Sequence, residues 1–234
     1  MRTERGRFEG DNVAMGGLPT IDVYCVAWPD WQQWFADFAC LLGRQEMAIA
    51  ARYRFEKDRV RYVICHGWLR RILGERLRKS PESLEVCLGR HGKPFTAGDW
   101  QFNLSYGGDW AIIALAKRMP LGVDLEPLRP FPESLSIARN FFSLDEIDLI
   151  ERSDESTRSR RFLMLWTRKE AYVKAVGQGL TAPLDNFSAG LDAPWIYDAN
   201  GCPWRLVNLP CLVTHAAALC APGCWQWRQH PLAL

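Results

Sequence analysis

The sequence lacks any hydrophobic run long enough to cross a membrane, and its first twenty residues lack the uninterrupted apolar segment of a signal peptide. Charged residues such as Arg2, Glu4 and Asp11 interrupt that stretch. The formal net charge of +2 is too small to indicate nucleic acid as the main partner. We therefore expect a cytosolic protein that binds neither a membrane nor nucleic acid.

The chain also lacks a paired CxxC pattern, although it contains eight cysteines. Without an export segment, reduced thiols are the expected state of these cysteines. Aromatic residues are plentiful instead, with eleven tryptophans and eleven phenylalanines. Because 48% of the 234 residues are hydrophobic, the chain can bury a substantial core, and disorder is excluded for the bulk of it. These values predict a globular protein of one or two domains.

One stretch in the second half, Trp166 to Lys174, reads WTRKEAYVK and lies late in a long helical pattern. Trp166, Glu170 and Val173 recur at three- and four-residue intervals, so Glu170 falls on the apolar face of this helix. An ionised carboxylate on that face needs a compensating cation. Lys174, four residues further on, could provide it as an ordinary salt bridge. Alternatively, Glu170 and Lys174 both point into a site.

A second stretch, Leu121 to Glu126, alternates with the period of a β-strand. Its three apolar residues face one way, so Asp124 and Glu126 project side by side on the other face. Carboxylates this close repel each other, and the repulsion is relieved by full solvation, a shared proton or a divalent cation. With Glu170 added, the three acids form an oxygen-ligand set suited to magnesium. Simple solvation and a magnesium site both remain open.

Local patterns also predict the secondary structure. Strands are expected at residues 21–27, 102–105, 111–116 and 121–126, and helices at 31–42, in two segments within 44–73, at 134–142, at 144–150 and up to about 176. Ser143, with Glu146 three residues later, is typical of a helix N-cap. Gly177 is expected to end the central helix.

The two acidic stretches, LGVDLE and WTRKEAYVK, resemble the paired signature of the 4'-phosphopantetheinyl transferases, specifically the large single-chain Sfp-type branch. Further motifs occur in that family's order: HGKP at residues 91–94, FNLS at 102–105, FFS at 141–143, and GQGL with PLDNF at 177–187. The resemblance implies an α+β fold of two similar halves with pseudo-twofold symmetry. We expect an N-terminal half at residues 1–119 and a C-terminal half at 120–234, with coenzyme A in the cleft between them.

The same resemblance implies an enzyme that moves the phosphopantetheine arm of coenzyme A onto a serine of an apo acyl or peptidyl carrier protein, releasing adenosine 3',5'-bisphosphate. Magnesium would be held by Asp124, Glu126 and Glu170, and the catalytic residues would be Glu170, Lys174 and Asp124, with Glu170 as the base. The expected coenzyme contacts are Arg52, Arg61, Lys93, Ser105, Tyr106 and Lys174. A chain that carries both halves of the site is expected to act as a monomer.

Several of the expected coenzyme contacts also have ordinary alternatives. Arg52 and Arg61 belong to a basic set with interleaved acids, which is equally typical of a solvated helix face. Lys93 and Ser105 fit exposed turns beside glycines. For these four residues, the coenzyme role rests on the resemblance.

Tyr106 departs from the family, which usually has histidine directly after the serine of FNLS. A histidine can carry a positive charge to a diphosphate, whereas tyrosine offers one neutral hydroxyl. The departure puts coenzyme affinity and its pH dependence in question. It slightly favours one alternative function, a non-catalytic coenzyme A-binding protein. A magnesium-dependent phosphodiesterase or nuclease also stays open, because such an enzyme too needs clustered carboxylates and cations.

Overall fold

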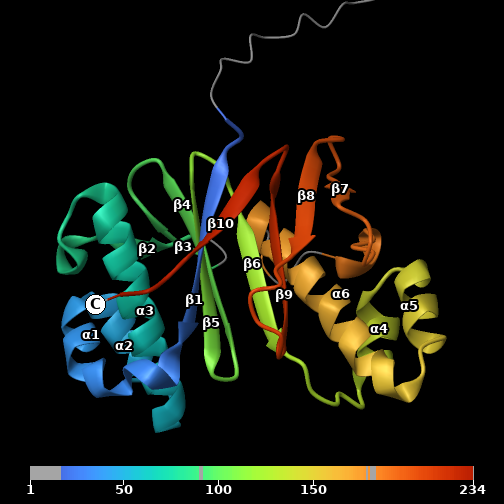
Figure 1. Ribbon diagram of the computed structural model, residues 1–234, viewed down its shortest axis with the longest axis horizontal. Helices are drawn as coiled ribbons and strands as arrows, with labels where there is room; N and C mark the ends of the chain where they lie inside the picture. The colour runs from blue at the N-terminus through green and yellow to red at the C-terminus, as the bar shows by residue number, and fades with distance from the viewer. Residues whose placement is uncertain (1–16, 90–91, 178, 180–182, 234) are drawn as a thin grey trace, which may run out of the picture.

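The computed structural model describes residues 17–89, 92–177, 179 and 183–233, and two four-stranded sheets form its centre (Figure 1). The first sheet has the order β10-β1-β5-β4 and contains β1 (Thr20–Ala27), β4 (Trp100–Gly107), β5 (Trp110–Lys117) and β10 (Gln226–His230). The second has the order β6-β9-β8-β7 and contains β6 (Gly122–Pro127), β7 (Trp195–Tyr197), β8 (Pro203–Asn208) and β9 (His215–Pro222). A separate two-stranded sheet joins β2 (Val86–Leu88) to β3 (Pro94–Thr96).

Two groups of helices lie on opposite sides of the sheets (Figure 1). The first group is α1 (Phe35–Leu41), α2 (Arg44–Ala50) and α3 (Glu56–Leu77), and the second is α4 (Ser134–Phe141), α5 (Leu144–Glu151) and α6 (Glu155–Val176). Short 3-10 helices occur at Trp28–Trp34, Pro81–Ser83 and Leu184–Asn186. None of the helices in the described ranges is both long and apolar enough to cross a lipid bilayer.

The alternation of side chains along the strands organises the molecule into four layers. In β5, Ile113 and Leu115 pack toward α3, whereas Ile112 and Ala114 pack into a core shared with the second sheet. The opposite face of the second sheet packs against α6, where Ala218 belongs to the same cluster as residues of that helix. Successive strand residues point to opposite faces, so each sheet can bury both sides. The resulting order is α3, first sheet, second sheet, α6.

This architecture confirms the expected α+β class. In each half, a helix of 22 residues packs on a four-stranded sheet. The strands at 21–27 and 111–116 are confirmed as β1 and β5. The helix expected at 31–42 is wrong in part, because residues 28–34 form a 3-10 helix that has Pro29 in its first turn, and α1 begins only at Phe35.

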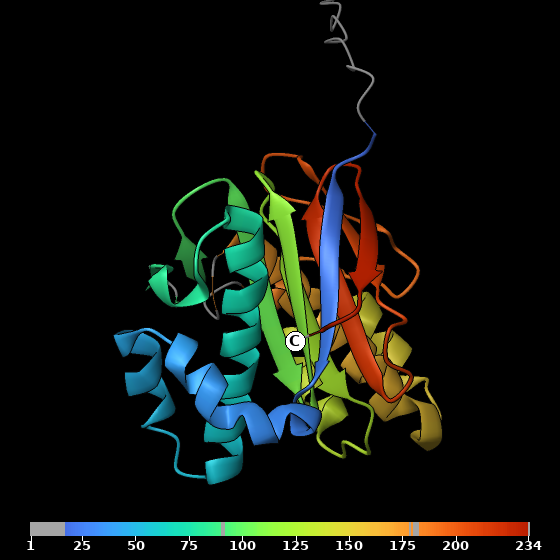
Figure 2. The same cartoon turned by 60° about the vertical axis from the view of Figure 1, so that its left-hand side comes forward.

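The last described strand crosses into the first sheet. β10 pairs in parallel with β1, with Thr20 opposite Gln226 and Tyr24 opposite His230, and Figure 2 shows the two strands side by side. The polar link between them is Asp22, whose carboxylate contacts Arg76 of α3 at 2.9 Å and His230 at 2.6 Å. The boundary between the two halves at residues 119 and 120 stays a prediction. β10 crosses this boundary, because it comes from the C-terminal half of the chain and pairs with a strand of the first half.

Candidate active site

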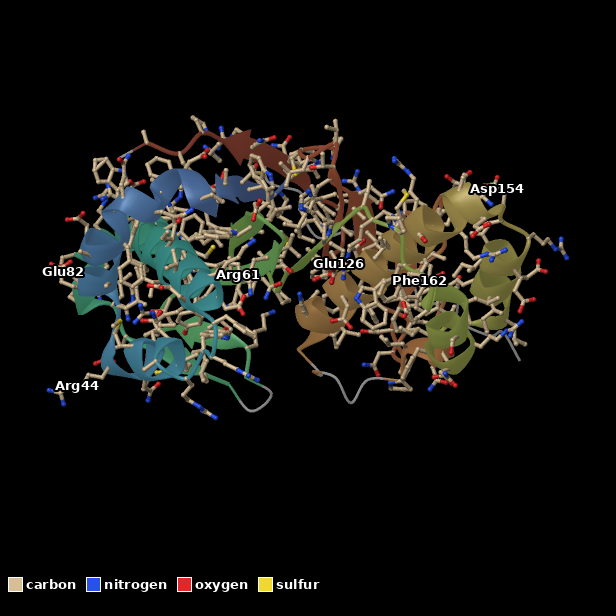
Figure 3. The ribbon with its side chains drawn as sticks, turned by 90° about the horizontal axis from the view of Figure 1, so that it is seen from below. Arg44, Arg61, Glu82, Glu126, Asp154 and Phe162 are labelled. Atoms are coloured by element: carbon tan, nitrogen blue, oxygen red, sulfur yellow. The ribbon has the colours of Figure 1, made fainter. Side chains whose placement is uncertain are left out.

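A cavity of about 540 Å3 lies where the two halves meet. Four elements supply most of its wall: α3, β4, β6 and α6. Seen from below, Arg61 of α3 and Glu126 of β6 lie near the middle of the molecule, whereas Arg44 and Asp154 lie at its outer edges (Figure 3). The cavity therefore collects side chains from both halves of the chain.

The edges of the two sheets meet beside this cavity. Asn103 of β4 is buried, and its Oδ1 accepts a 2.8 Å hydrogen bond from the backbone N–H of Val123 in β6. Gly107 lies equally close, since a Cβ added there would be 2.7 Å from the carbonyl oxygen of Leu125. This close approach of β4 to β6 brings Ser105 next to Asp124.

The expected alternation along β6 is confirmed. Val123 and Leu125 are buried in the core between the sheets, whereas Asp124 and Glu126 line the cavity on the side of α6. Asp124 is only 5% exposed. The strand therefore holds two carboxylates at one wall of the cavity.

Helix α6 supplies the remaining charged residues of this wall. Asp154 caps its first turn by accepting from the N–H of Thr157 at 2.9 Å, and Gly177 ends it with a left-handed φ of 78°. The helix touches β6 at Gly122, where an added Cβ would be 2.1 Å from the carbonyl oxygen of Ala171. This contact explains how Glu170 and Lys174, on the same face, reach the carboxylates of β6.

The ammonium of Lys174 joins three elements of the site. Its Nζ donates to Asp124 Oδ1 at 2.6 Å and to Ser105 Oγ at 3.2 Å, and the Ser105 hydroxyl donates to the same Oδ1 at 2.8 Å. The alternative prediction of an ordinary salt bridge between Glu170 and Lys174 is wrong, because the Lys174 ammonium pairs with Asp124 instead. Glu170 forms no ion pair with any described residue, although only 9% of its surface is exposed to solvent.

The environment of the cavity disfavours the ionised forms of Glu170 and Glu126. Burial raises the pKa of Glu170, and the charge of Asp124 raises it further while Lys174 opposes the shift. Burial is also the largest cause of the raised pKa of Glu126, followed by Asp124. Both shifts have the sign expected for crowded, poorly solvated carboxylates. Added positive charge in the cavity would relieve them.

A magnesium ion fits the chemistry of this donor set. Asp124 Oδ2 is buried and has no hydrogen-bond partner within the described part of the chain, and carboxylate oxygens are the ligands that magnesium prefers. Nevertheless, no three acidic, histidine or cysteine side chains among the described residues already form a compact metal-binding group. The three carboxylates line one cavity and would have to converge on the ion.

Lys93, expected to contact the coenzyme, borders a smaller cavity of about 260 Å3 together with Asn103, Glu170 and Lys174. Its Nζ donates to the carbonyl oxygens of Leu121 at 2.8 Å and Lys174 at 2.6 Å. Burial, and secondly the charge of Lys174, lower the pKa of Lys93 to about 8. Its ammonium thus ties the start of β6 to the end of α6. The motif residues His91, Gln178 and Leu180 lie outside the described residues.

Tyr106 and Arg61 meet at the opposite wall. Tyr106 lines the cavity, its hydroxyl is 3.2 Å from that of Tyr53, and the Arg61 guanidinium lies 4.6 Å from its ring centroid. Burial, more than the bond to Tyr53, raises the pKa of Tyr106, so its phenol stays neutral. Arg61 pairs with Asp58 at 2.9 Å. Arg52 is exposed in the turn after α2 and does not line the cavity.

Sequence patterns missed two buried cations next to Glu170. Lys169 donates to Glu146 at 2.7 Å and to the carbonyl oxygens of Leu184 and Phe187, and Arg168 donates to that of Ala189. Both side chains are at most 2% exposed. They anchor the segment after α6 to the helix. Ser143 and Glu146 form the predicted capping box, but that local pattern does not reveal the tertiary bond to Lys169.

Comparison with known proteins identifies the family. Residues 120–220 match the model of the 4'-phosphopantetheinyl transferase superfamily, and residues 26–118 match that of the 4'-phosphopantetheinyl transferase N-terminal region. The protein slr0495 from Synechocystis sp. is 32% identical over 186 residues, covering 75% of this chain and 74% of that protein.

Two further relatives carry the family name. The 4'-phosphopantetheinyl transferase HetI from Nostoc sp. is 35% identical over 179 residues, covering 74% of this chain and 75% of that protein. The 4'-phosphopantetheinyl transferase Sfp from Bacillus subtilis is 29% identical over 156 residues, covering 66% and 68%. The chain belongs to the 4'-phosphopantetheinyl transferase superfamily and is an enzyme of this class, as the paired acidic stretches predicted.

Proposed function

We propose that this enzyme transfers the 4'-phosphopantetheine arm of coenzyme A to a serine hydroxyl of an apo acyl or peptidyl carrier protein. The observation that supports this most directly is the convergence of Asp124, Glu126, Glu170 and Lys174 on one cavity between the two halves. A diphosphate substrate needs both a cationic donor and a means of neutralising nearby acids, and this wall has the residues for both. We also propose that one chain, carrying both walls, acts as a monomer.

In the proposed complex, Asp124, Glu126 and Glu170 would hold magnesium, which would screen the charge of the coenzyme diphosphate. The proposed role of Lys174 and Ser105 is to donate hydrogen bonds to the diphosphate oxygens. In the ligand-free site both donate to Asp124 Oδ1, so the single O–H of Ser105 would have to turn from that carboxylate to the diphosphate. The proposed role of Lys93 is to fix Lys174 through its backbone carbonyl and to add positive charge behind it. Arg52 and Arg61 are proposed as outer contacts to the nucleotide.

Glu170 is the proposed general base. Its side chain lines the cavity with Asp124 and Lys174 and forms no ion pair with a described residue, so its carboxylate is available to accept a proton. The carrier serine oxygen forms a bond to the β-phosphorus, and the bond from that phosphorus to the bridging oxygen breaks. Glu170 takes the serine proton, and the bridging oxygen leaves with adenosine 3',5'-bisphosphate. Lys174 stabilises the negative charge that develops on this leaving group.

Intact-mass analysis of an apo carrier protein incubated with the enzyme, coenzyme A and magnesium tests the proposal. We expect the carrier to gain one phosphopantetheinyl group, and we expect a chelator to prevent the gain. Glu170→Gln, which keeps the side-chain shape, should reduce the rate by at least about a hundredfold. Glu155→Gln, at the exposed start of the same helix, is the matched control and should keep the wild-type rate.

The outcomes separate the candidate functions. If the protein binds coenzyme A but none of several carriers gains mass, the proposed transferase function is wrong. The protein would then be a coenzyme A-binding protein. Release of nucleotide without carrier would instead indicate a phosphodiesterase. A Glu170→Gln variant that transfers at the wild-type rate would remove Glu170 as the base.

A further inference from the structure

His66 of α3 lines the main cavity on the wall opposite Lys174 and the carboxylates. Among the side chains that line the described part of this cavity, Lys174 and His66 are the two that can carry positive charge. The neighbouring Tyr106 stays neutral, as described above. At this second wall, His66 is therefore the lining side chain that can offer positive charge to a ligand with several phosphates, with the Arg61 guanidinium behind Tyr106.

A buried acid fixes the orientation of the His66 ring. His66 Nδ1 lies 3.3 Å from Glu46 Oε1, while Glu46 Oε2 accepts from Arg70 Nε at 2.7 Å and from the N–H of Gly43 at 2.9 Å. Burial would raise the pKa of Glu46, but the hydrogen bonds from His66 and Gly43 and the charge of Arg70 outweigh it and lower the pKa. Glu46 is thus an ionised acceptor.

An ionised carboxylate can only accept hydrogen bonds, so Nδ1 of His66 must be the donor to Glu46. This leaves Nε2 for a ligand, and no described residue forms a hydrogen bond with it. Tyr62 stacks on the imidazole with ring centroids 3.9 Å apart, which restricts rotation of the ring. His66 is therefore a pre-oriented group whose second nitrogen has no partner within the described chain.

We propose that the protonated His66 ring donates a hydrogen bond from Nε2 to a phosphate oxygen of the coenzyme A nucleotide and that Glu46, which accepts from Nδ1, is its positioning residue. The inference rests on the proposed function, because that function puts coenzyme A in this cavity. The acid, the ring and the stacked tyrosine come from two helices of the first half.

Steady-state kinetics of two variants test the proposal, with coenzyme A as the varied substrate and apo carrier protein in excess. His66→Phe keeps the ring on Tyr62 but removes both nitrogens, and His66→Gln keeps a neutral hydrogen-bonding group. We expect KM for coenzyme A to rise about tenfold in His66→Phe and less in His66→Gln, with kcat changed less than about twofold. His230→Gln, the same substitution on β10 away from the cavity, should leave KM unchanged.

Repeating the assay with 3'-dephospho-coenzyme A identifies the phosphate. If the effect of His66→Phe disappears with this substrate, His66 binds the 3'-phosphate. If the effect persists, His66 binds the diphosphate, and both results support the inference. A KM within about twofold of wild type in both variants and with both substrates overturns it.

Calorimetric binding of coenzyme A to the same proteins separates this inference from the proposed function. If the wild-type protein modifies no carrier but binds coenzyme A more tightly than His66→Phe does, the role of His66 is supported and the transferase function is wrong. Equal binding by wild type and both variants would overturn the inference whatever the carrier assay shows. Melting temperatures verify folding, and if His66→Phe does not fold, His66→Gln decides the outcome.

Discussion

Glu170 and Glu126 show how single residues of the site work against the stability of the ligand-free protein. Burial raises both pKa values above the ordinary 4.5 of glutamate, and the charge of Asp124 adds to the effect. A raised pKa means that folding favours the protonated acid. That stabilising contribution is fully present below pH 4.5 and is lost as the pH rises through the raised values. At neutral pH, the two carboxylates therefore cost folding free energy.

Glu170→Gln is accordingly expected to raise the melting temperature of the ligand-free protein at pH 7, because it removes an unfavourable charge and keeps the shape. The gain should vanish at pH 3, well below the ordinary pKa of 4.5, where Glu170 is protonated in both the folded and the unfolded chain. Thermal unfolding by circular dichroism at the two pH values measures it, with Glu155→Gln as the exposed control. A lower melting temperature at pH 7 would show that contacts of the carboxylate outweigh its burial.

Lys93 gives a second prediction for a single residue. Because its ammonium is buried and lies near Lys174, its pKa is lowered from 10.5 to about 8. A side-chain NMR titration of lysine-labelled protein should show one lysine that titrates near pH 8, and Lys93→Arg should remove that signal. If every lysine of the wild-type protein titrates near 10, the ammonium gains more from its two carbonyl acceptors than it loses through burial.

At the scale of elements, the contact between β6 and α6 sets the spacing of the site. A Cβ on Gly122 would lie 2.1 Å from the Ala171 carbonyl oxygen and 2.4 Å from the Ala175 nitrogen, and both are backbone atoms that cannot rotate away. Only glycine allows this approach. The helix that carries Glu170 would move away from the strand that carries Asp124 if the position held any side chain.

Gly122→Ala is therefore expected to destabilise the protein by about 1–3 kcal/mol or more and to lower kcat for transfer. Urea unfolding and the carrier assay measure the two effects. Gly190→Ala is the matched control, because a Cβ there would meet its nearest neighbour at an ordinary 3.6 Å. Similar stability of the two variants would mean that α6 can shift without cost.

The parts of the site that sequence could predict are those encoded by local periodicity. Asp124 and Glu126 share a strand face, and Glu170 and Lys174 share a helix face, so spacing alone places each pair. The bond between Glu146 and Lys169, and that between Glu46 and His66, join residues at least 20 positions apart. Such contacts depend on how helices pack, which periodicity does not specify. The apolar pattern also does not show that the cations Arg168 and Lys169 are buried.

At the scale of the whole molecule, the two halves share one core. Ile112 and Ala114 of the first sheet belong to the same buried cluster as Val123 and Leu219 of the second, and β10 completes the first sheet from the far end of the chain. Neither half can bury these surfaces alone.

We therefore expect one cooperative unfolding transition, with equal calorimetric and van't Hoff enthalpies in differential scanning calorimetry. Deleting residues 226–234 should lower the melting temperature, because it removes the parallel partner of β1 and the contact of His230 with Asp22. Two separate transitions in the full-length protein would instead show that each half folds independently.

The pairing of β1 with β10 also bears on how the protein is made. Thr20 and Gln226 are 206 residues apart, and at ordinary rates of translation the ribosome needs about 10–40 s to add that many residues. During this interval, one edge of β1 has no partner strand, and an open edge is a template for aggregation. The nascent chain cannot complete its first sheet until β10 has been made, so the enzyme should become active only after that strand has been synthesised.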